Sequence, residues 1–307
     1  MKKQERVARI GKDGRVLVVG AAGMLGRAVR EAAVARGARV DAVDIASNPA
    51  EGIDAFDMTD AADLDRVAQG NWSVVINCAA WTDVDGAEAN EEAATLLNGT
   101  AVGELARACK RGGAVCVHYS TDYVFDGGGT EPYRVDHPID PVNAYGRSKA
   151  VGERLVRESG CEHVLLRTSW LYGAWGQNFV LTMMNLMRSK DELKVVDDQR
   201  GRPSSVRQLA RTTLALLDAG ARGTYHGCDG GECTWYGLAS AIRDEIGAGT
   251  VVHPCTSDAF PRPAKRPAYS VMDLTETVKV TGELVAWRDE LRSVIEQASR
   301  LETGAEA

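Results

Sequence analysis

RVLVVGAAGMLGRAVREAAVAR, residues 15–36, carries the strongest structural signal in the chain. A short apolar run ends at Gly20, and apolar residues then recur at helical spacing. Gly20, Gly23 and Gly26 between them form the pattern G-x-x-G-x-x-G. Glycines in such a turn let the backbone approach a pyrophosphate, whose charge is then met by the N-terminus of the following helix. The stretch therefore predicts a dinucleotide-binding strand–turn–helix unit.

A carboxylate at the end of the next apolar segment strengthens this prediction. The segment RVDAVD (39–44) ends in Asp44, 18 residues after Gly26. A carboxylate there can accept hydrogen bonds from both hydroxyls of an adenosine ribose, and it would repel a 2′-phosphate. Asp44 therefore favours NADH over NADPH. The alternative is a glycine-rich turn beside an aspartate that faces solvent.

The segments around this unit alternate between strand and helix patterns. Strands are predicted at 15–20, 39–44, 73–80, 114–120 and 163–169, and helices at 24–36, 60–70, 91–113 and 143–159. Alternation at this spacing predicts a Rossmann-type doubly wound α/β fold, in which helices cover both faces of a parallel sheet.

The pattern becomes less regular after residue 170, which suggests a smaller second α/β domain. We predict a flexible leader at 1–14 and an NAD(P)-binding domain at 15–170, to which a later segment at about 193–222 returns. Residues 171–192 and 223–307 are predicted to form mainly a substrate-binding domain.

Composition excludes several classes of protein. The net charge of −7 argues against a nucleic-acid partner, and no apolar run approaches the roughly 20 residues that span a membrane. The charged N-terminus has no apolar core typical of a secretory signal. The seven cysteines lack a C-x-x-C motif, and the spacing of Cys228, Cys233 and His226 is poor for zinc. These features predict a cytoplasmic protein without a metal centre of its own.

The segment NAYGRSK (143–149) places Tyr145 and Lys149 four residues apart, on one face of a predicted helix. A tyrosine has an ordinary pKa near 10, and a neighbouring ammonium group lowers that pKa toward neutral pH. Thr121 ends the preceding predicted strand, where open α/β sheets bind their ligands. The three side chains together predict proton transfer to a ketone oxygen, although such a pair alone also arises by chance.

Further motifs make the chain similar to one family. They are GAAGMLG (20–26), NCAAWTDVDGAE (77–88), HYSTDYVFDG (118–127), PVNAYGRSKAVGE (141–153), RTSWLYG (167–173), NFV (178–180), DDQRGRPSS (197–205), TYH (224–226) and AKRPAYSVMD (264–273). In these motifs the chain resembles the dTDP-4-dehydrorhamnose reductases, which are extended short-chain dehydrogenases/reductases. The resemblance covers nearly the whole chain and implies reduction of the C4 ketone of dTDP-4-dehydro-6-deoxy-L-mannose to dTDP-L-rhamnose by NADH or NADPH.

The resemblance also assigns roles to individual residues. It implies a cofactor site made of Gly20, Gly23, Met24, Leu25, Gly26, Asp44, Asp57, Met58, Ala80, Trp81, Thr82, Tyr119, Tyr145 and Lys149. It implies catalysis by Thr121, Tyr145 and Lys149, and sugar contacts from Thr121, Asp122 and Trp170. Arg266, in the matching KRP segment, is predicted to bind the diphosphate. The alternatives are a loop-stabilising carboxylate for Asp122, a core position for Trp170 and a solvated basic loop for Arg266.

Three departures from the family pattern leave the sugar open. Tyr269 stands where relatives often carry asparagine, Trp81 occupies a variable position, and the loop DGGGT (126–130) is rich in glycine. Tyr123 stands where related 4,6-dehydratases carry glutamate, which disfavours a dehydratase.

Two rival functions therefore remain beside the reductase. One is a sister ketoreductase acting on another dTDP-4-keto-6-deoxysugar of an antibiotic pathway. The other is a non-catalytic NAD(P)-binding regulatory subunit of the same fold. The resemblance also raises a homodimer with Mg²⁺ at the dimer contact, although the acidic residues form no recognisable metal motif.

Overall fold

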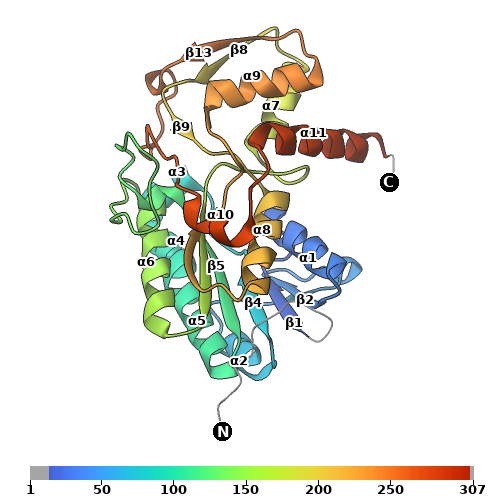
Figure 1. Ribbon diagram of the computed structural model, residues 1–307, viewed down its shortest axis with the longest axis vertical. Helices are drawn as coiled ribbons and strands as arrows, with labels where there is room; N and C mark the ends of the chain where they lie inside the picture. Colours follow the sequence, from blue (N-terminus) through green and yellow to red (C-terminus); the bar gives the residue numbers. More distant parts are fainter. Residues whose placement is uncertain (1–13, 305–307) are drawn as a thin grey trace.

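A parallel sheet forms the larger part of the molecule in the computed structural model, which describes residues 14–304 (Figure 1). Its strand order is β11-β6-β5-β4-β1-β2-β3. The strands are β1 (Arg15–Val19), β2 (Arg39–Asp44), β3 (Ile53–Ala55), β4 (Val74–Asn77), β5 (Val115–Thr121), β6 (His163–Thr168) and β11 (Gly223–His226). All neighbouring strands are parallel, which confirms the predicted α/β fold class.

Alternation along the central strand explains why both faces of the sheet are covered. Val16 and Val18 of β1 belong to one buried cluster, whereas Leu17 and Val19 belong to another. Successive side chains of a strand point to opposite faces, so a continuous apolar run buries both. The two faces are covered by α1 (Met24–Ala35) and α8 (Val206–Asp218) on one side, and by α2 (Ala61–Gln69), α5 (Ala101–Gly112) and α6 (Ala144–Ser159) on the other.

The helix predicted at 91–113 is not continuous. The structure divides it into α4 (Glu91–Thr95), a π-helical segment η2 (Leu96–Thr100) and α5. Buried Asn98 lies in the π-helical segment, and its side chain bonds to both the backbone N–H and the carbonyl of Trp81. Hydrophobic spacing alone does not distinguish α from π turns, and π turns frequently occur near functional sites.

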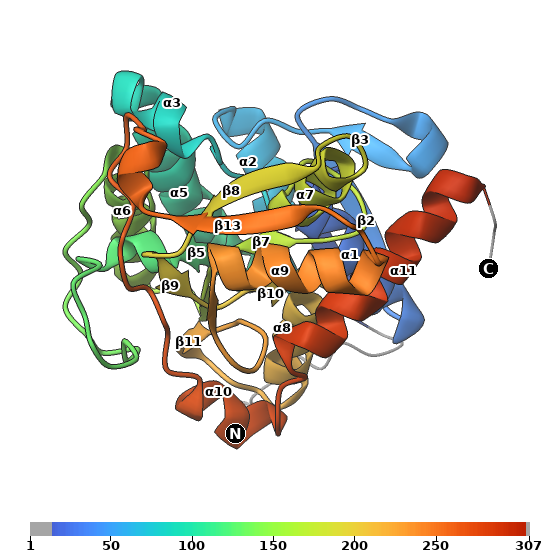
Figure 2. The same cartoon turned by 90° about the horizontal axis from the view of Figure 1, so that it is seen from above.

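A second, smaller part lies over one end of the sheet (Figures 1 and 2). Its elements are β7 (Leu171–Tyr172), α7 (Phe179–Met187), β8 (Glu192–Val196), β9 (Arg200–Gly201), β10 (Ser204–Ser205), β12 (Cys233–Thr234), α9 (Trp235–Ile246), β13 (Val251–Cys255) and α11 (Trp287–Thr303). It has a buried cluster of its own, to which α7, α9 and α11 contribute most side chains. The remaining short elements are η1 (Pro49–Glu51), α3 (Val84–Ala89), η3 (Asp122–Val124), η4 (Ser257–Ala259) and α10 (Thr275–Thr281).

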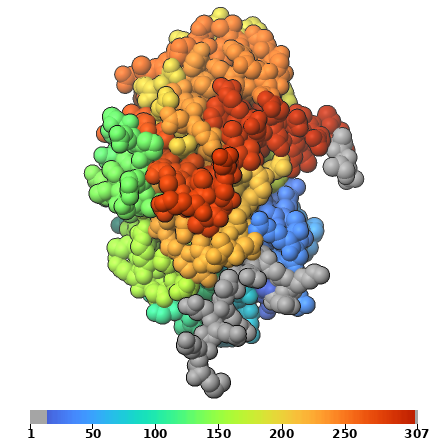
Figure 3. Space-filling view, viewed as in Figure 1, coloured from blue at the N-terminus to red at the C-terminus, as the bar shows by residue number. Residues whose placement is uncertain are grey.

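The chain passes between the two parts more often than a simple division would suggest. Within the segment 193–222, α8 packs on α1 beneath the large sheet, but β8 pairs with β13 in the second part. Strand β11 follows directly and extends the large sheet beside β6. The space-filling view shows the red C-terminal segments on the face where the two parts meet (Figure 3).

Two further sequence predictions concern the N-terminal leader and membrane-spanning segments. The flexible leader falls almost entirely on residues outside the described range. Within residues 14–304, no helix combines the length and apolarity needed to cross a bilayer.

Candidate active site

The glycine turn between β1 and α1 is closely packed against the end of β4. Gly20 has a left-handed φ of 75°, and a Cβ atom there would lie 2.5 Å from the backbone nitrogen of Ala79. A Cβ atom on Gly26 would lie 2.0 Å from the carbonyl oxygen of Gly20. No side chain caps the N-terminus of α1, which begins after Gly23. A tight turn and an uncapped helix N-terminus fit a bound pyrophosphate.

Asp44 ends β2 beside this turn. One carboxylate oxygen accepts a hydrogen bond from the N–H of Ala22 at 2.9 Å, and the other accepts one from the N–H of Ile45 at 2.8 Å. Each oxygen has capacity for a second hydrogen bond, so the carboxylate can still accept a ribose hydroxyl. Asp57 lies nearby, and the N–H and hydroxyl of Thr59 hold the pKa of its carboxyl below the ordinary value.

Thr121, Tyr145 and Lys149 line one cleft at the carboxyl end of β5. Thr121 comes from the last residue of β5, and the other two come from the first two turns of α6. That helix begins where it does because the side chain of Asn143 accepts a hydrogen bond from the N–H of Gly146. The structure therefore brings these three side chains to one cleft, and their roles stay predictions.

The environment of Tyr145 differs from the expectation. Burial and the negative charge of Asp122 raise the pKa of Tyr145, while a hydrogen bond with Thr121 acts to lower it. The sequence predicted that Lys149 would lower the pKa of Tyr145. That pKa is raised instead, because burial of the phenol dominates. The positive charge of an oxidised nicotinamide would act in the lowering direction.

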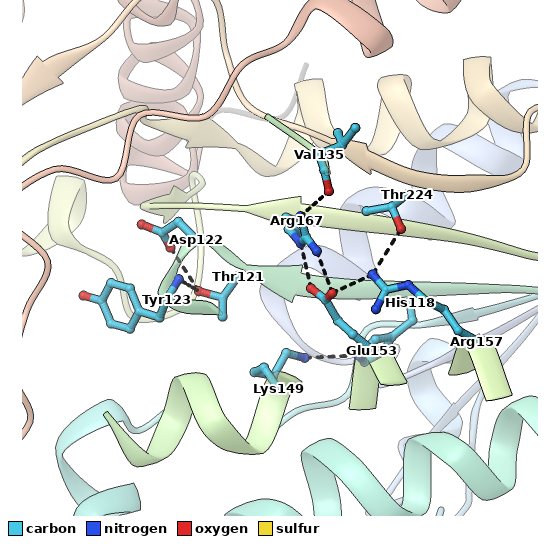
Figure 4. Close-up of polar contacts among 10 residues, drawn as sticks. All are labelled: His118, Thr121, Asp122, Tyr123, Val135, Lys149, Glu153, Arg157, Arg167 and Thr224. Carbon is cyan, nitrogen blue, oxygen red and sulfur yellow. Dashed lines mark hydrogen bonds and ion pairs between the residues drawn. The ribbon is translucent and has the colours of Figure 1, made fainter. Parts of the chain in front are cut away.

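Lys149 is only 2% exposed and lies against the sheet (Figure 4). Burial lowers its pKa to about 8, while the carboxylate of Glu153 acts to raise it. Its Nζ atom lies 3.4 Å from Nε2 of His118 on β5. Burial and the charge of Lys149 lower the pKa of His118 well below its usual range, so this imidazole is neutral. A lysine with a pKa near 8 can gain or lose a proton close to neutral pH.

Asp122 and Trp170 also line the cleft. Asp122 is 3% exposed, and burial raises the pKa of its carboxyl to about 6. Its Oδ1 atom accepts a hydrogen bond of 3.0 Å from the Thr121 hydroxyl (Figure 4). Trp170 has a left-handed φ of 47° and stacks on Trp235. Neither residue is an ordinary surface position.

The cleft has a volume of about 1280 Å³ and contains most of the predicted residues. The predicted residues that line it are Gly20, Gly23, Met24, Leu25, Asp44, Asp57, Met58, Ala80, Thr82, Tyr119, Thr121, Asp122, Tyr145, Lys149 and Trp170. Its size suits a dinucleotide together with a second ligand, since single-ligand pockets measure about 300–1,000 Å³.

Three predicted residues do not line the cleft. Gly26 lies behind the glycine turn, where it allows close packing. Trp81 directs its indole N–H to the carbonyl of Asp83. Arg266 pairs with Asp85, with 3.0 Å between nitrogen and oxygen, and its role in binding a diphosphate stays a prediction.

The cleft also includes residues that the sequence did not indicate. They are Val19, Ala22, Ile45, Phe56, Cys78, Ala79, Asp83, Val84, Leu97, Ser120, Tyr123, Thr168, Ser169, Leu171, Gly176, Gln177 and Trp235. Several flank predicted residues, so the motif around Trp170 could have indicated Thr168 and Ser169. Trp235 had no such signal, because it begins a helix far along the chain.

Comparison with known proteins gives a consistent result. A family model described as the RmlD substrate binding domain matches residues 14–300. A dTDP-4-dehydrorhamnose reductase of Streptomyces griseus is 44% identical over 267 residues, which cover 84% of this chain and 85% of that protein. A dTDP-4-keto-6-deoxy-D-glucose reductase of Streptomyces niveus is 40% identical over 260 residues, with 84% and 88% covered.

Solved structures agree over nearly the whole chain. The crystal structure of a dTDP-4-dehydrorhamnose reductase from Clostridium acetobutylicum superposes with a TM-score of 0.86 at 37% identity, covering 93% of this chain and 99% of that one. The enzyme of the same name from Bacillus anthracis, solved in complex with NADP, gives a TM-score of 0.82 at 33% identity, with 92% and 99% covered. The chain therefore belongs to the dTDP-4-dehydrorhamnose reductase family.

Proposed function

We propose that this protein is an NAD(P)H-dependent reductase that converts the C4 ketone of dTDP-4-dehydro-6-deoxy-L-mannose to the alcohol of dTDP-L-rhamnose. The observation that carries the proposal is the placement of Thr121, Tyr145 and Lys149 in one cleft with the glycine turn. The names of the relatives from Streptomyces griseus and Clostridium acetobutylicum support the substrate.

The residues have distinct roles in this proposal. When bound, a reduced nicotinamide supplies the hydride. Tyr145 donates a proton to the sugar oxygen, and the Thr121 hydroxyl hydrogen-bonds that oxygen as negative charge develops on it. Lys149 holds positive charge near the phenol and can return a proton to it, since its pKa is about 8. Asp122 and Trp170 position the sugar.

The expected roles of the remaining residues follow the same division. Met24 and Leu25 lie at the pyrophosphate, and Asp57 and Met58 flank the adenine. The proposal places Ala80, Thr82 and Tyr119 along the middle of the cofactor. All three residues line the cleft, which supports this assignment.

The decisive test is oxidation of NADH or NADPH by the purified protein in the presence of a panel of dTDP-4-ketosugars. We expect turnover with the L-mannose derivative, and Tyr145→Phe should reduce kcat by about 10²–10⁴-fold because it removes the general acid. Because Tyr145 also belongs to the expected cofactor site, the Kd of NADH is measured in parallel to separate a loss of binding from a loss of kcat. If Tyr145→Phe retained full kcat, the assigned role of Tyr145 would be wrong.

A second candidate is a sister ketoreductase for another dTDP-4-keto-6-deoxysugar. The Streptomyces niveus relative, named a dTDP-4-keto-6-deoxy-D-glucose reductase, supports it, as does Tyr269 in place of asparagine. The same panel separates the two candidates by their kcat/KM values. Binding of NADH without turnover of any ketosugar would instead support the non-catalytic regulatory subunit.

Asp44 is proposed to make NADH the preferred cofactor. Its carboxylate would meet the 2′-phosphate of NADPH unfavourably. Asp44→Asn retains an oxygen for one of the two backbone N–H groups and removes the charge. We expect the ratio of kcat/KM for NADH to that for NADPH to fall by about tenfold or more, a change of about 1.4 kcal/mol. Asp54→Asn, at an exposed position of β3 that does not line the cleft, is the control. An unchanged ratio in Asp44→Asn would contradict the role.

The wider organisation is also a proposal. We propose a cofactor domain and a substrate domain, a homodimer, Mg²⁺ at the dimer contact and a cytoplasmic location. The two buried cores support the division, and the seven unpaired cysteines fit a reducing compartment. Within residues 14–304 no group of three or more metal-ligating side chains is arranged for a metal ion, so Mg²⁺ would require a contact between chains. Light scattering of the full chain with Mg²⁺ or EDTA measures both the dimer and its metal dependence.

A further inference from the structure

Trp170 and Trp235, here called the tryptophan pair, stack on each other in the cleft. Their ring centroids lie 3.8 Å apart, and the ring planes differ by 14°. Trp170 follows β6 of the large sheet, whereas Trp235 is the first residue of α9 in the second part. Both residues line the cleft that contains Thr121 and Tyr145. The pair therefore joins the two parts of the molecule at the proposed substrate site.

The backbone of Trp170 has an unusual conformation. Among the described non-glycine residues only Asn71 and Trp170 have a positive φ, which is 47° at Trp170. For a bulky residue this conformation is unfavourable, and it persists only where the surroundings enforce it. Such positions cluster at sites that bind ligands.

Three neighbours enforce the conformation of Trp170. Gly201 leaves space for the indole, because a Cβ atom there would lie 2.8 Å from two atoms of the ring. The backbone carbonyl of Trp170 accepts a hydrogen bond of 3.2 Å from the N–H of Ser204. Trp235 covers one face of the ring. The indole of Trp170 is therefore held in a single orientation.

Trp235 is itself fixed more firmly than a surface aromatic residue. Its indole N–H donates a hydrogen bond of 3.1 Å to the side chain of Gln199, and Phe179 packs against its ring at 4.6 Å. Strand β12, which directly precedes Trp235, pairs with β9, which contains Gly201. The short antiparallel pair of β9 and β12 thus positions the ring of Trp235 and also provides, at Gly201, the space for the indole of Trp170.

The position of the pair indicates which part of a ligand it meets. Thr168 pairs in register with Thr121, and Trp170 is only two residues further along the chain. Trp170 therefore lies close to the end of β5 where the reacting ketone is proposed to bind, and Trp235 covers one face of the Trp170 ring. The hydroxyl of Thr168 is buried without a hydrogen-bond partner and lines the same cleft, so it offers a bond to a polar ligand. An apolar ring near the unpaired hydroxyl of Thr168 suits a 6-deoxyhexose, which has both C–H faces and hydroxyls.

We propose that Trp235 is a positioning residue for the sugar: it holds the indole of Trp170 in place, and the tryptophan pair thereby determines which 6-deoxy-4-ketohexose is accepted. This inference rests on the proposed function, since it concerns the same substrate site. It extends that function to a residue in the second part that does not belong to the catalytic group.

Steady-state kinetics of Trp235→Ala and Trp235→Phe test the inference. Trp235→Ala should raise KM for the ketosugar about tenfold or more and change kcat by less than about threefold, because uniform binding of the sugar is lost. Trp235→Phe should remain within about threefold of the parent KM, since a smaller ring can still stack. The ratio of kcat/KM for two ketosugars epimeric at one ring carbon should move toward unity in the alanine variant only.

Two binding measurements locate the effect. The inhibition constant of dTDP, which lacks the sugar, should change by less than about twofold in Trp235→Ala, and so should the Kd of NADH. Trp72→Phe is the control for loss of an indole, because Trp72 packs on Arg15 away from the cleft. Its KM should equal that of the parent protein.

The outcomes separate this inference from the proposed function. An unchanged KM in Trp235→Ala, or a parallel loss of dTDP or NADH binding, would overturn the role of Trp235 while the parent protein still turned over a ketosugar. If the parent protein oxidised no cofactor with any ketosugar, the proposed function would fail and this inference with it.

Discussion

Asp122 lies at the start of η3 with 3% of its surface exposed, and its carboxyl contacts the Thr121 hydroxyl. Burial raises its pKa to about 6, although hydrogen bonds from Ser270 and Thr121 act to lower it. A buried carboxylate of this kind costs stability, and a protein retains such a group where a ligand uses it. We therefore regard Asp122 as a site residue whose environment opposes folding at neutral pH.

Asp122→Asn should stabilise the protein in a pH-dependent manner. The folded-state pKa of about 6 lies above the ordinary value of 3.8. The protonated carboxyl therefore makes its full contribution to stability only below about pH 4. Its contribution to stability is lost as pH rises through about 6. Asparagine has no charge to bury. We therefore expect the free energy of unfolding of the variant to exceed that of the parent protein by about 1–3 kcal/mol at pH 8 and to differ little from it near pH 4.

Urea unfolding at pH 4.5 and pH 8 measures this difference. Asp54→Asn, at an exposed position of β3, is the matched control and should show no such trend. An equal effect of Asp122→Asn at both pH values would mean that the carboxyl does not titrate as described. The ketosugar KM of Asp122→Asn should rise in either case.

Helix α6 carries both Tyr145 and Lys149, and a buried ion pair ties it to the sheet. Glu153 is fully buried and lies one turn beyond Lys149, and Arg167 of β6 donates two hydrogen bonds of 2.8 Å to its carboxylate (Figure 4). Burial is the largest influence on the pKa of Glu153 and acts to raise it, but the bonds and charge of Arg167 and the bonds from Ser120 and Arg157 together outweigh burial, so this pKa lies below the ordinary value. The ion pair fixes the position of α6 relative to the sheet, and thereby the positions of Tyr145 and Lys149.

Arg167→Met should destabilise the protein by about 3 kcal/mol, because Arg157 is then the one salt-bridge partner left to the buried Glu153 carboxylate among residues 14–304. Adding Glu153→Gln should recover part of this loss, since no unpaired charge then remains buried. Arg154→Met removes an exposed pair with Glu158 on the same helix and should cost less than about 1 kcal/mol. Urea unfolding gives all three values, and a loss for Arg167→Met no larger than that for Arg154→Met would contradict this account.

The predictable elements were those with strong periodicity. The βα unit from Arg15 to Ala35 and the strand ending in Asp44 could be predicted, because apolar period and glycine position both indicate them. The π-helical segment around Asn98 could not, since its apolar spacing matches that of an α-helix. Strands β9 and β12 have two residues each, too few to show any period, and so the position of Trp235 was missed.

A buried polar cluster connects the sheet to the second part at the scale of the whole molecule. Asp229, which follows β11, accepts hydrogen bonds from the N–H of Ser205 at 3.1 and 3.0 Å and from the phenol of Tyr172 at 2.8 Å. The hydroxyl of Ser205 donates to Glu290 of α11 at 2.6 Å, and Arg211 of α8 also pairs with that carboxylate. These residues are separated by up to 118 positions, so no local pattern could indicate that they meet. Their contacts hold the second part over the cleft.

Tyr172→Phe tests how much this cluster contributes. The variant removes one of the hydrogen bonds to Asp229, which is completely buried, so we expect unfolding to require about 1–3 kcal/mol less free energy. Burial raises the pKa of Asp229 well above its ordinary value, and the phenol of Tyr172 acts to lower it. Without the phenol the Asp229 carboxyl also loses a hydrogen bond that acts to lower its pKa. Tyr236→Phe, in the same core, is the matched control.

Since the cluster positions the second part over the cleft, KM of Tyr172→Phe for the ketosugar should rise while the Kd of NADH stays constant. A free energy of unfolding equal to that of the parent protein would show that the Tyr172 phenol contributes nothing to the cluster.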